Sequence, residues 1–243
     1  MRIKGVKTIY TQAINEHINS YSKPSVIKGE NQDFTYSDIR EDISFVAVAD
    51  GVSQCENSAY GAEYVCRIIG DAVIEEADYL FGLPPKKAAA VIVRYIRSQL
   101  KRLASGHNTD PASYASTLSF ICHHKGMKKL MVFNLGDSCI YTVDNGKNIR
   151  QLDSVGFTSR FIPVSTMTEG AERETAVEIY DDTDFDSVFL CTDGFWRIME
   201  GSRTNSAELK NAIRNSDMEF VTEFVKATEN QDDCTFLHFN INQ

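Results

Sequence analysis

Three apolar, β-prone segments that lie far apart in the sequence each end in an aspartate next to a glycine. FVAVADG ends at Asp50-Gly51, VFLCTDG ends at Asp193-Gly194, and KLMVFNLGD ends at Gly136-Asp137. Asp and Gly are common turn residues, so a single ending of this kind would indicate only a loop. Apolar runs belong in a protein core, however, so the carboxylates that follow them emerge at the edge of the core. The repeated pattern suggests that several carboxylates serve one site.

The pattern along the chain predicts an α+β fold with antiparallel sheets. Apolar residues at spacings of three and four predict a long helix over 57–80, and a second helix is expected between Pro84-Pro85 and Gly106. Shorter helices are predicted over 207–214 and 219–228, and strands over 43–49, 117–123, 129–135, 138–143, 187–191 and 234–241. Because strands and helices do not alternate, antiparallel sheets covered by helices fit better than a parallel doubly wound sheet.

Three further expectations concern local structure and organisation. The strands at 129–135 and 138–143 are expected to pair around a tight turn at Gly136. The segment 150–185 is polar with scattered Gly and Pro, so it is expected to be irregular and either functional or partly disordered. No linker or repeat interrupts the sequence, so residues 1–243 are expected to form a single domain.

Composition excludes several classes of function. The chain has 34 acidic and 25 basic residues and a net charge of −9, which disfavours general nucleic-acid binding. No window approaches the roughly 20 apolar residues that a membrane span requires, and the N-terminus has no apolar core typical of a signal peptide. The six cysteines form no Cys-x-x-Cys pair, which indicates free thiols in a reducing compartment. We therefore expect a cytoplasmic protein.

The acidic strand endings favour divalent cations. Carboxylates that converged without opposite charges would repel one another, and some would stay protonated. Mg²⁺ and Mn²⁺ prefer oxygen ligands and relieve this repulsion. A glycine after the aspartate, as at Gly51, lets a backbone carbonyl approach the same ion because no Cβ obstructs it. Two such ions about 3.5–4 Å apart are suited to phosphoryl displacement.

Six short motifs occur in an order that resembles the metal-dependent Ser/Thr protein phosphatases of the protein phosphatase 2C type. They run from about Lys28 to Thr235 and read GENQD, VADGV, the pair Ser116-Thr117, NLGDS, LCTDG and DDCT. The resemblance implies a bacterial-like, single-domain member with a four-layer α-β-β-α sandwich, in which helices flank two antiparallel sheets. It also implies that the segment 150–185 is the flap that the family carries near its substrate.

The resemblance implies a set of metal ligands. Asp50 would bridge two Mn²⁺ or Mg²⁺ ions, and the carbonyl of Gly51 would bind one of them. Asp193 and Asp232 would complete the ligands of the first ion.

The remaining roles that the resemblance implies lie around this pair of ions. Asp33 would hold the water shell of the second ion, and Asp137, with Asp193, can hold a third and weaker ion. Lys28 stands where the family has an arginine that binds phosphate. Lysine keeps the charge but loses the bidentate fork of a guanidinium. The expected catalytic residues are therefore Lys28, Asp33 and Asp50.

Other departures from the family pattern affect the mechanism and the surroundings of the site. Val52 follows Asp50-Gly51, where many eukaryotic members carry a histidine that is a candidate general acid. The neighbours His123 and His124 point to opposite faces of a predicted strand, so they are not expected to share a metal. Trp196, the one tryptophan in the sequence, is expected to be a packing anchor.

The expected function is a monomeric, cytoplasmic phosphatase that removes phosphate from serine or threonine in proteins. A metal-activated water would attack phosphorus directly, and a Ser/Thr kinase would act in opposition. Two alternatives remain open. One is a phosphatase of a small phosphorylated metabolite, and the other is a phosphatase-like module that binds phosphoproteins without turnover. The intact acidic positions argue against a binding module.

Overall fold

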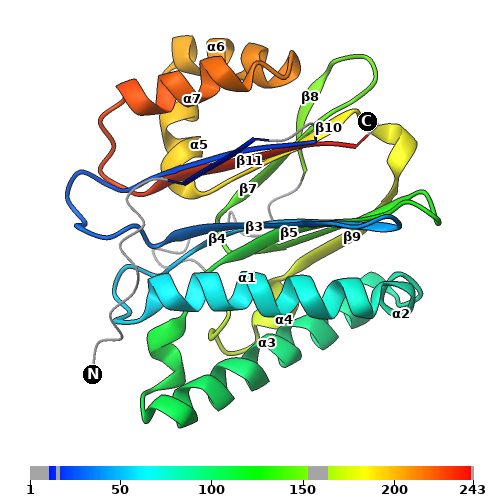
Figure 1. Ribbon diagram of the computed structural model, residues 1–243, viewed down its shortest axis with the longest axis vertical. Coiled ribbons are helices and arrows are strands. Elements are labelled where there is room, and N and C mark those ends of the chain that lie inside the picture. The colour runs from blue at the N-terminus through cyan, green and yellow to red at the C-terminus, as the bar shows by residue number, and fades with distance from the viewer. Residues whose placement is uncertain (1–10, 15–16, 153–163, 242–243) are drawn as a thin grey trace.

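A computed structural model describes residues 11–14, 17–152 and 164–241. Within these residues two antiparallel sheets stack face to face, and each carries helices on its outer side (Figure 1). This arrangement confirms the predicted four-layer α-β-β-α sandwich. The six-stranded sheet has the order β1 (Thr11–Ile14), β2 (Ile18–Lys23), β11 (Cys234–Asn240), β10 (Ser187–Cys191), β7 (Cys139–Val143) and β8 (Ile149–Leu152).

The second sheet and the helices complete the four layers. The five-stranded sheet has the order β3 (Asp33–Ile39), β4 (Ile43–Asp50), β5 (Leu118–His124), β6 (Lys129–Leu135) and β9 (Ala176–Asp181). Its outer side carries α1 (Ser58–Glu75), α2 (Ala77–Phe81), α3 (Pro85–His107) and α4 (Ala171–Glu174). The outer side of the six-stranded sheet carries α5 (Asp193–Glu200), α6 (Arg203–Arg214) and α7 (Met218–Ala227). Two 3₁₀ turns, η1 (Pro111–Tyr114) and η2 (Asp182–Asp184), lie between these elements.

β4 is apolar from Phe45 to Ala49 because both of its faces are buried. Phe45, Ala47 and Ala49 belong to the core between the five-stranded sheet and its helices. Val46 and Val48 belong to the core between the two sheets. Since successive side chains of a strand point to opposite faces, a strand in an inner layer needs apolar residues on both faces. Asp50 follows this run at the point where the strand leaves both cores.

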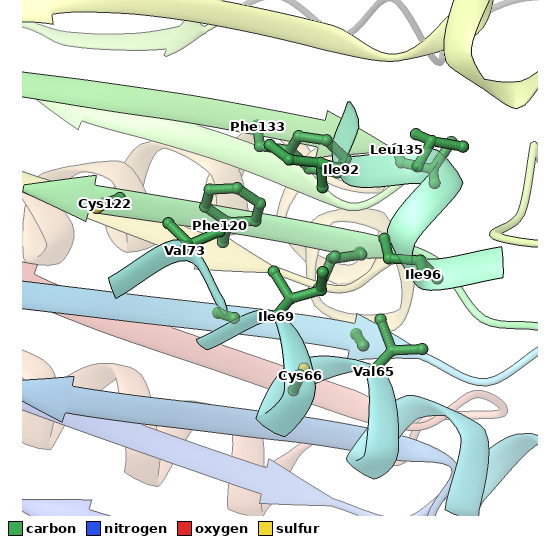
Figure 2. Packing of buried hydrophobic residues seen from close by; sticks show 14 of the residues in the cluster. Val65, Cys66, Ile69, Val73, Ile92, Ile96, Phe120, Cys122, Phe133 and Leu135 are labelled. Carbon is green, nitrogen blue, oxygen red and sulfur yellow. The ribbon is translucent and has the colours of Figure 1, made fainter. Parts of the chain in front are cut away.

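The helix layer rests on the sheet through aliphatic stripes and stacked rings. Figure 2 shows Val65, Ile69 and Val73 of α1 and Ile92 and Ile96 of α3 directed at the sheet. There they meet the aromatic rings of β5 and β6, of which Phe120 and Phe133 stack with centroids 4.6 Å apart. Aromatic contacts of this kind add to the stabilisation that apolar burial gives. The packing makes this sheet a firm support for the residues at the ends of its strands.

The six predicted strands are confirmed to within two residues at each end, but the predicted hairpin is wrong. β6 pairs with β5 and β9, whereas β7 pairs with β10 and β8 in the other sheet. The chain crosses between the sheets at Gly136, whose φ of 116° lies in the region that favours glycine. A Cβ there would lie 2.5 Å from the side chain of Thr117. Both strands are apolar on both faces, so their sequence fits either pairing.

Three further predictions need correction or qualification. The helix expected over 57–80 is divided at Glu76 into α1 and α2. The sequence did not reveal this break because the apolar spacing continues across it. β9 lies inside the segment 150–185 that was expected to be irregular. It is an edge strand in which only Val177 is buried, so it lacks an apolar pattern. Residues 153–163 of the expected flap lie outside the described residues.

None of the helices in the described ranges combines the length and the apolar character that a membrane crossing requires.

Candidate metal centre

The ends of strands from both sheets bring three of the predicted carboxylates together. Asp50 is the last residue of β4, Asp137 lies on the crossing from β6 to β7, and Asp193 is the first residue of α5 after β10. One side-chain oxygen from each of the three lies within 4.8 Å of the others. Asp33, the first residue of β3, is the antiparallel register partner of Asp50. The topology therefore explains why carboxylates that are far apart in sequence meet at one edge of the sandwich.

Two of these carboxylates have one oxygen held by the protein and one buried oxygen without a partner. Asp33 accepts a hydrogen bond from Thr192 Oγ1 at 2.8 Å through Oδ2, and its Oδ1 is buried and unpaired. Asp193 Oδ2 lies 2.7 Å from Arg197 Nη2, and its Oδ1 is also buried and unpaired. Buried polar atoms normally have partners. Unsatisfied carboxylate oxygens beside a cluster made only of oxygen donors fit divalent cations.

Burial, together with the charges of neighbouring carboxylates, raises the pKa values of three of these aspartates. Burial, reinforced by the charge of Asp233, raises the pKa of Asp33 to about 8. Burial and the charges of Asp33 and Asp193 raise the pKa of Asp50 well above its usual range. Burial, followed by the charges of Asp137 and Asp232, raises the pKa of Asp193 to about 6. Without a cation the cluster would keep protons near neutral pH, and a divalent ion would replace them.

Lys28 and Asp232 lie beside the three-carboxylate cluster and pair with each other. The Lys28 ammonium forms an ion pair with Asp232 and lies 3.7 Å from Asp233 Oδ2. Burial alone would lower the pKa of Lys28, but the hydrogen bond to Asp232 and the charge of Asp233 raise it. Asp232 also lies 3.6 Å from Arg197 Nη1. Lys28 is therefore held at the edge of the centre as a cation, as a phosphate-binding role requires.

Asp233, which the sequence did not single out as a functional residue, anchors the loop that carries Lys28. It is almost fully buried, and its two carboxylate oxygens accept backbone N–H groups of Ser25 at 2.7 Å and Gln32 at 2.9 Å. A Cβ on Gly194 would overlap the backbone carbonyl of Asp233, so glycine is needed where α5 meets this loop. The double aspartate in DDCT is the signal that was available: one carboxylate faces the site and the next supports the loop.

Further polar residues hold the candidate ligands in place. Thr117 Oγ1 accepts the backbone N–H of Asp50 at 2.9 Å and hydrogen-bonds Ser138 Oγ at 3.2 Å, which ties β4 to the residue after Asp137. Trp196 Nε1 donates to the carbonyl of Asp137 at 3.0 Å, so this tryptophan positions a ligand loop besides packing.

Close packing against α1 requires glycine at position 51, which the sequence did not reveal. A Cβ at this position would lie 2.7 Å from the backbone of Ser58, where α1 begins. Real Cβ atoms do not approach backbone this closely, so no other residue fits without a shift of α1. The prediction that the Gly51 carbonyl binds an ion stays a prediction.

A sequence profile of the protein phosphatase 2C family matches residues 28–236 of the chain, and these include every predicted site residue. The chain belongs to the protein phosphatase 2C family. A comparison with curated protein sequences gave no match.

Solved structures with the same fold include several phosphatases. A bacterial serine phosphatase aligns with a TM-score of 0.64 and 14% identity over 93% of this chain and 97% of its own. The serine/threonine phosphatase Stp1 from Staphylococcus aureus aligns with a TM-score of 0.60 and 14% identity over 99% and 100%. The catalytic domain of the serine/threonine phosphatase PstP, solved with two manganese ions, aligns with a TM-score of 0.59 and 15% identity over 92% and 96%. At these identities the likeness shows the fold.

In this phosphatase 2C chain the position after Asp50-Gly51 offers no proton donor. Val52 is half-buried, and its backbone N–H donates to the carbonyl of Ala115 at 3.0 Å. Among the described residues the three-carboxylate cluster contains no histidine. His123 and His124 lie at the other end of β5, where they pair with Asp182 and Asp78. They take no part in the candidate centre.

Proposed function

We propose that this chain is a protein phosphatase that hydrolyses phosphoserine and phosphothreonine with two Mn²⁺ or Mg²⁺ ions. The observation that carries the proposal is the meeting of Asp50, Asp137 and Asp193 at strand ends, beside buried carboxylate oxygens that have no protein partner. In a chain of the phosphatase 2C family, an oxygen-only cluster of this kind fits a two-metal centre.

The ligand roles follow from the positions of the side chains. We assign Asp50 and the Gly51 carbonyl to a pair of ions, Asp193 and Asp232 to the first ion, and Asp33 to the surroundings of the second. When bound, such ions supply an activated water and stabilise the charge that develops in phosphoryl displacement. Direct attack by water on phosphorus would need no phosphoenzyme.

The chain's own residues would position the reacting groups. Thr192 fixes Asp33 through one oxygen, and the other oxygen, which is buried and unpaired, stays available to the second ion's surroundings. The ammonium of Lys28 has three N–H donors, and Asp232 and Asp233 engage two of them. The third donor would bind the phosphate. The ion pair with Asp232 limits the freedom of Lys28, so less entropy is lost when phosphate binds.

The surface beside Lys28 favours a protein over a small metabolite as substrate. Val26 and Ile27 are 62% and 73% exposed, although their loop is held by the backbone bonds to Asp233 and by Val26 N–H to the carbonyl of Asn230 at 3.1 Å. Exposed apolar side chains that are held in place suit contact with the residues that flank a phosphoserine. A small phosphorylated metabolite has no such residues to offer.

The proposal includes a partner and a location. The partner is a phosphoprotein made by a Ser/Thr kinase, and the enzyme would act as a monomer in the cytoplasm. Support for a reducing location comes from the cysteines, which are all free, with five of the six buried.

The deciding experiment compares phosphate release from three substrate classes. Purified protein is incubated with a phosphoserine or phosphothreonine protein, with a sugar phosphate and with p-nitrophenyl phosphate, each in Mn²⁺ and in EDTA. We expect Mn²⁺-dependent release, with a larger kcat/KM for the phosphoprotein than for the sugar phosphate. Release from the sugar phosphate alone would indicate a metabolite phosphatase. Tight binding of the phosphoprotein without release would indicate a binding module.

A double variant tests the apolar surface. Val26→Ser with Ile27→Ser should lower kcat/KM for the phosphoprotein and leave p-nitrophenyl phosphate hydrolysis unchanged, because the small aryl ester does not reach this loop. Met127→Ser, at another exposed apolar residue, is the matched control. An equal loss on both substrates would mean that the loop supports the centre and does not contact the protein substrate.

A further inference from the structure

One basic side chain reaches the carboxylates from the solvent side. Arg197 lies one turn after Asp193 on α5, so the two side chains share a face of the helix. Its Nη2 lies 2.7 Å from Asp193 Oδ2, and its Nη1 lies 3.6 Å from Asp232 Oδ2. The side chain is 56% exposed, so it approaches the cluster from its outer edge.

The guanidinium is also held from the side by the single tryptophan. Arg197 Cζ lies 5.7 Å from the ring centroid of Trp196, a distance typical of a cation–π contact. The indole N–H of Trp196 donates to the carbonyl of Asp137. Arg197 thus contacts Asp193 directly and is linked to the Asp137 loop through Trp196.

The charges of the centre balance when Arg197 is counted. Six carboxylates lie in or beside the centre, namely Asp33, Asp50, Asp137, Asp193, Asp232 and Asp233. Two divalent ions together with Lys28 and Arg197 carry six positive charges. A further divalent ion near Asp137 and Asp193 would meet a permanent cation that already uses Asp193 Oδ2. The repulsion between a divalent ion and a guanidinium a few ångströms apart is large even at an effective dielectric constant of about 20.

We propose that Arg197 is a built-in cation that takes the place of a third divalent ion at the Asp137–Asp193 edge of the centre. This inference rests on the proposed two-metal function and deepens it. Arg197 is a positioning residue here: it holds Asp193 through Oδ2 and leaves Oδ1 for the ions inside. The chain should therefore bind two ions and no third one, even at millimolar metal.

The experiment counts bound Mn²⁺ per chain by equilibrium dialysis over a range of free Mn²⁺ that extends to millimolar. The wild-type chain is compared with Arg197→Lys, Arg197→Ala and Arg197→Glu, and with the control Arg203→Ala, which removes an exposed arginine from α6. Fluorescence of Trp196 gives a second readout, because this residue contacts both Arg197 and the Asp137 loop. Circular dichroism establishes that each variant is folded.

We expect two ions in the wild type, in Arg197→Lys and in the control. Arg197→Ala should gain a third ion at millimolar Mn²⁺, and Arg197→Glu should bind it at least about tenfold more tightly, since a carboxylate replaces the lost cation. Adding Asp137→Ala to Arg197→Ala should abolish the third ion. The proposal is overturned if the wild type binds three ions or if Arg197→Ala still binds two. A wild type that binds no Mn²⁺ would overturn the proposed function together with this inference.

Discussion

The two ends of the five-stranded sheet both hold ionisable side chains, but the strand residues pair with groups of the opposite type at only one end. At the end where β5 stops, His123 Nε2 lies 3.1 Å from Asp182 Oδ2, and Lys129 Nζ lies 2.6 Å from Asp181 Oδ1. At the opposite end, where β4 stops, Asp50 faces other carboxylates. The strand residues of this sheet are therefore paired at one end and lie among like charges at the other, where the cations Lys28 and Arg197 come from outside the sheet.

The contrast separates groups that the fold already pairs from groups whose like charges remain to be neutralised. Paired groups need nothing further, and exposed pairs such as Lys129–Asp181 add little to stability. Buried like charges destabilise the folded chain unless protons or cations neutralise them, and such perturbed groups gather at functional sites. The predictions below test this difference between the two ends.

The largest effect is expected from the loss of a ligand charge. Asp50→Asn and Asp193→Asn should lower turnover by more than about 100-fold, because even residues that only support metal ligands cost 10–100-fold when lost. Both variants should stay folded, and their metal-free Tm should equal or exceed that of the wild type because repulsion falls. Asp181→Asn, at the paired end, is the matched control and should keep full activity. Turnover of more than a few per cent in either site variant would show that the ligand assignment is wrong.

The next effect concerns the leaving group. A positioned general acid contributes about 10²–10⁴-fold to a hydrolysis that expels a poor leaving group. Val52 cannot supply a proton, and the three-carboxylate cluster, among the described residues, contains no histidine. We expect aryl phosphates such as p-nitrophenyl phosphate to react readily and simple alkyl phosphomonoesters much more slowly. The measurement is a linear free-energy plot of rate against leaving-group pKa. A nearly flat plot would reveal a general acid that comes from another part of the chain or from the substrate.

A smaller effect is expected at Lys28. Lys28→Ala should raise KM for phosphorylated substrates about tenfold with little change in kcat, since a charged hydrogen bond contributes roughly 1.5–3 kcal/mol. Lys28→Arg should bind phosphate as well or better, because a guanidinium can form two parallel hydrogen bonds. Lys129→Ala is the control at the paired end. If Lys28→Ala leaves KM unchanged, the ammonium serves only its ion pairs with Asp232 and Asp233.

The strand endings could be predicted from the sequence because buried segments are rich in apolar residues. A strand in an inner layer buries apolar residues on both faces, so the step from Ala49 to Asp50 marks the edge of the core. The same logic failed for β9, which lies at a sheet edge and needs only one buried side chain. It also failed for the pairing of β6 and β7, since an apolar strand can pack equally well in either sheet.

The supporting residues of the site were harder to foresee. Asp233 contacts residues that lie 201 to 208 positions away in the sequence, and Arg197 contacts a residue one helical turn away. Aspartate and arginine are both common on protein surfaces, so neither residue stands out in the sequence. Only the fold shows that Asp233 is buried under the Lys28 loop and that Arg197 points at Asp193. The positions of the candidate ligands could be read from strand ends, whereas the groups that hold these side chains could not.

The smallest effect is a pH dependence of the metal-free chain. The folded chain has a pKa of about 8 at Asp33, whereas an ordinary aspartate has 3.8. Between these values the folded state keeps a proton that the unfolded state has lost, so the free energy of unfolding falls as pH rises. The lowered pKa values of His123 and His238, the latter about 4, act in the opposite sense and only below about pH 6.5. The raised pKa values of buried thiols such as Cys66 and Cys122 act in the same sense as that of Asp33, but only where unfolded thiols ionise, above about pH 7.5. The range from about pH 6.5 to 7.5 therefore isolates the carboxylates.

In that range the Tm of the chain in EDTA should fall by several degrees, because each kcal/mol corresponds to about 2–4 °C for a domain of about 150–250 residues. Asp33→Asn should reduce the fall, since its amide holds no titrating proton, whereas Asp181→Asn at the paired end should leave it unchanged. Saturating Mn²⁺ should also suppress it, because the ions replace the protons that the buried carboxylates would otherwise keep. A wild-type Tm that stays constant or rises between these pH values without metal would show that the carboxylates are already ionised in the folded chain. The two ends of the sheet would then differ in geometry and not in the free energy of their charges.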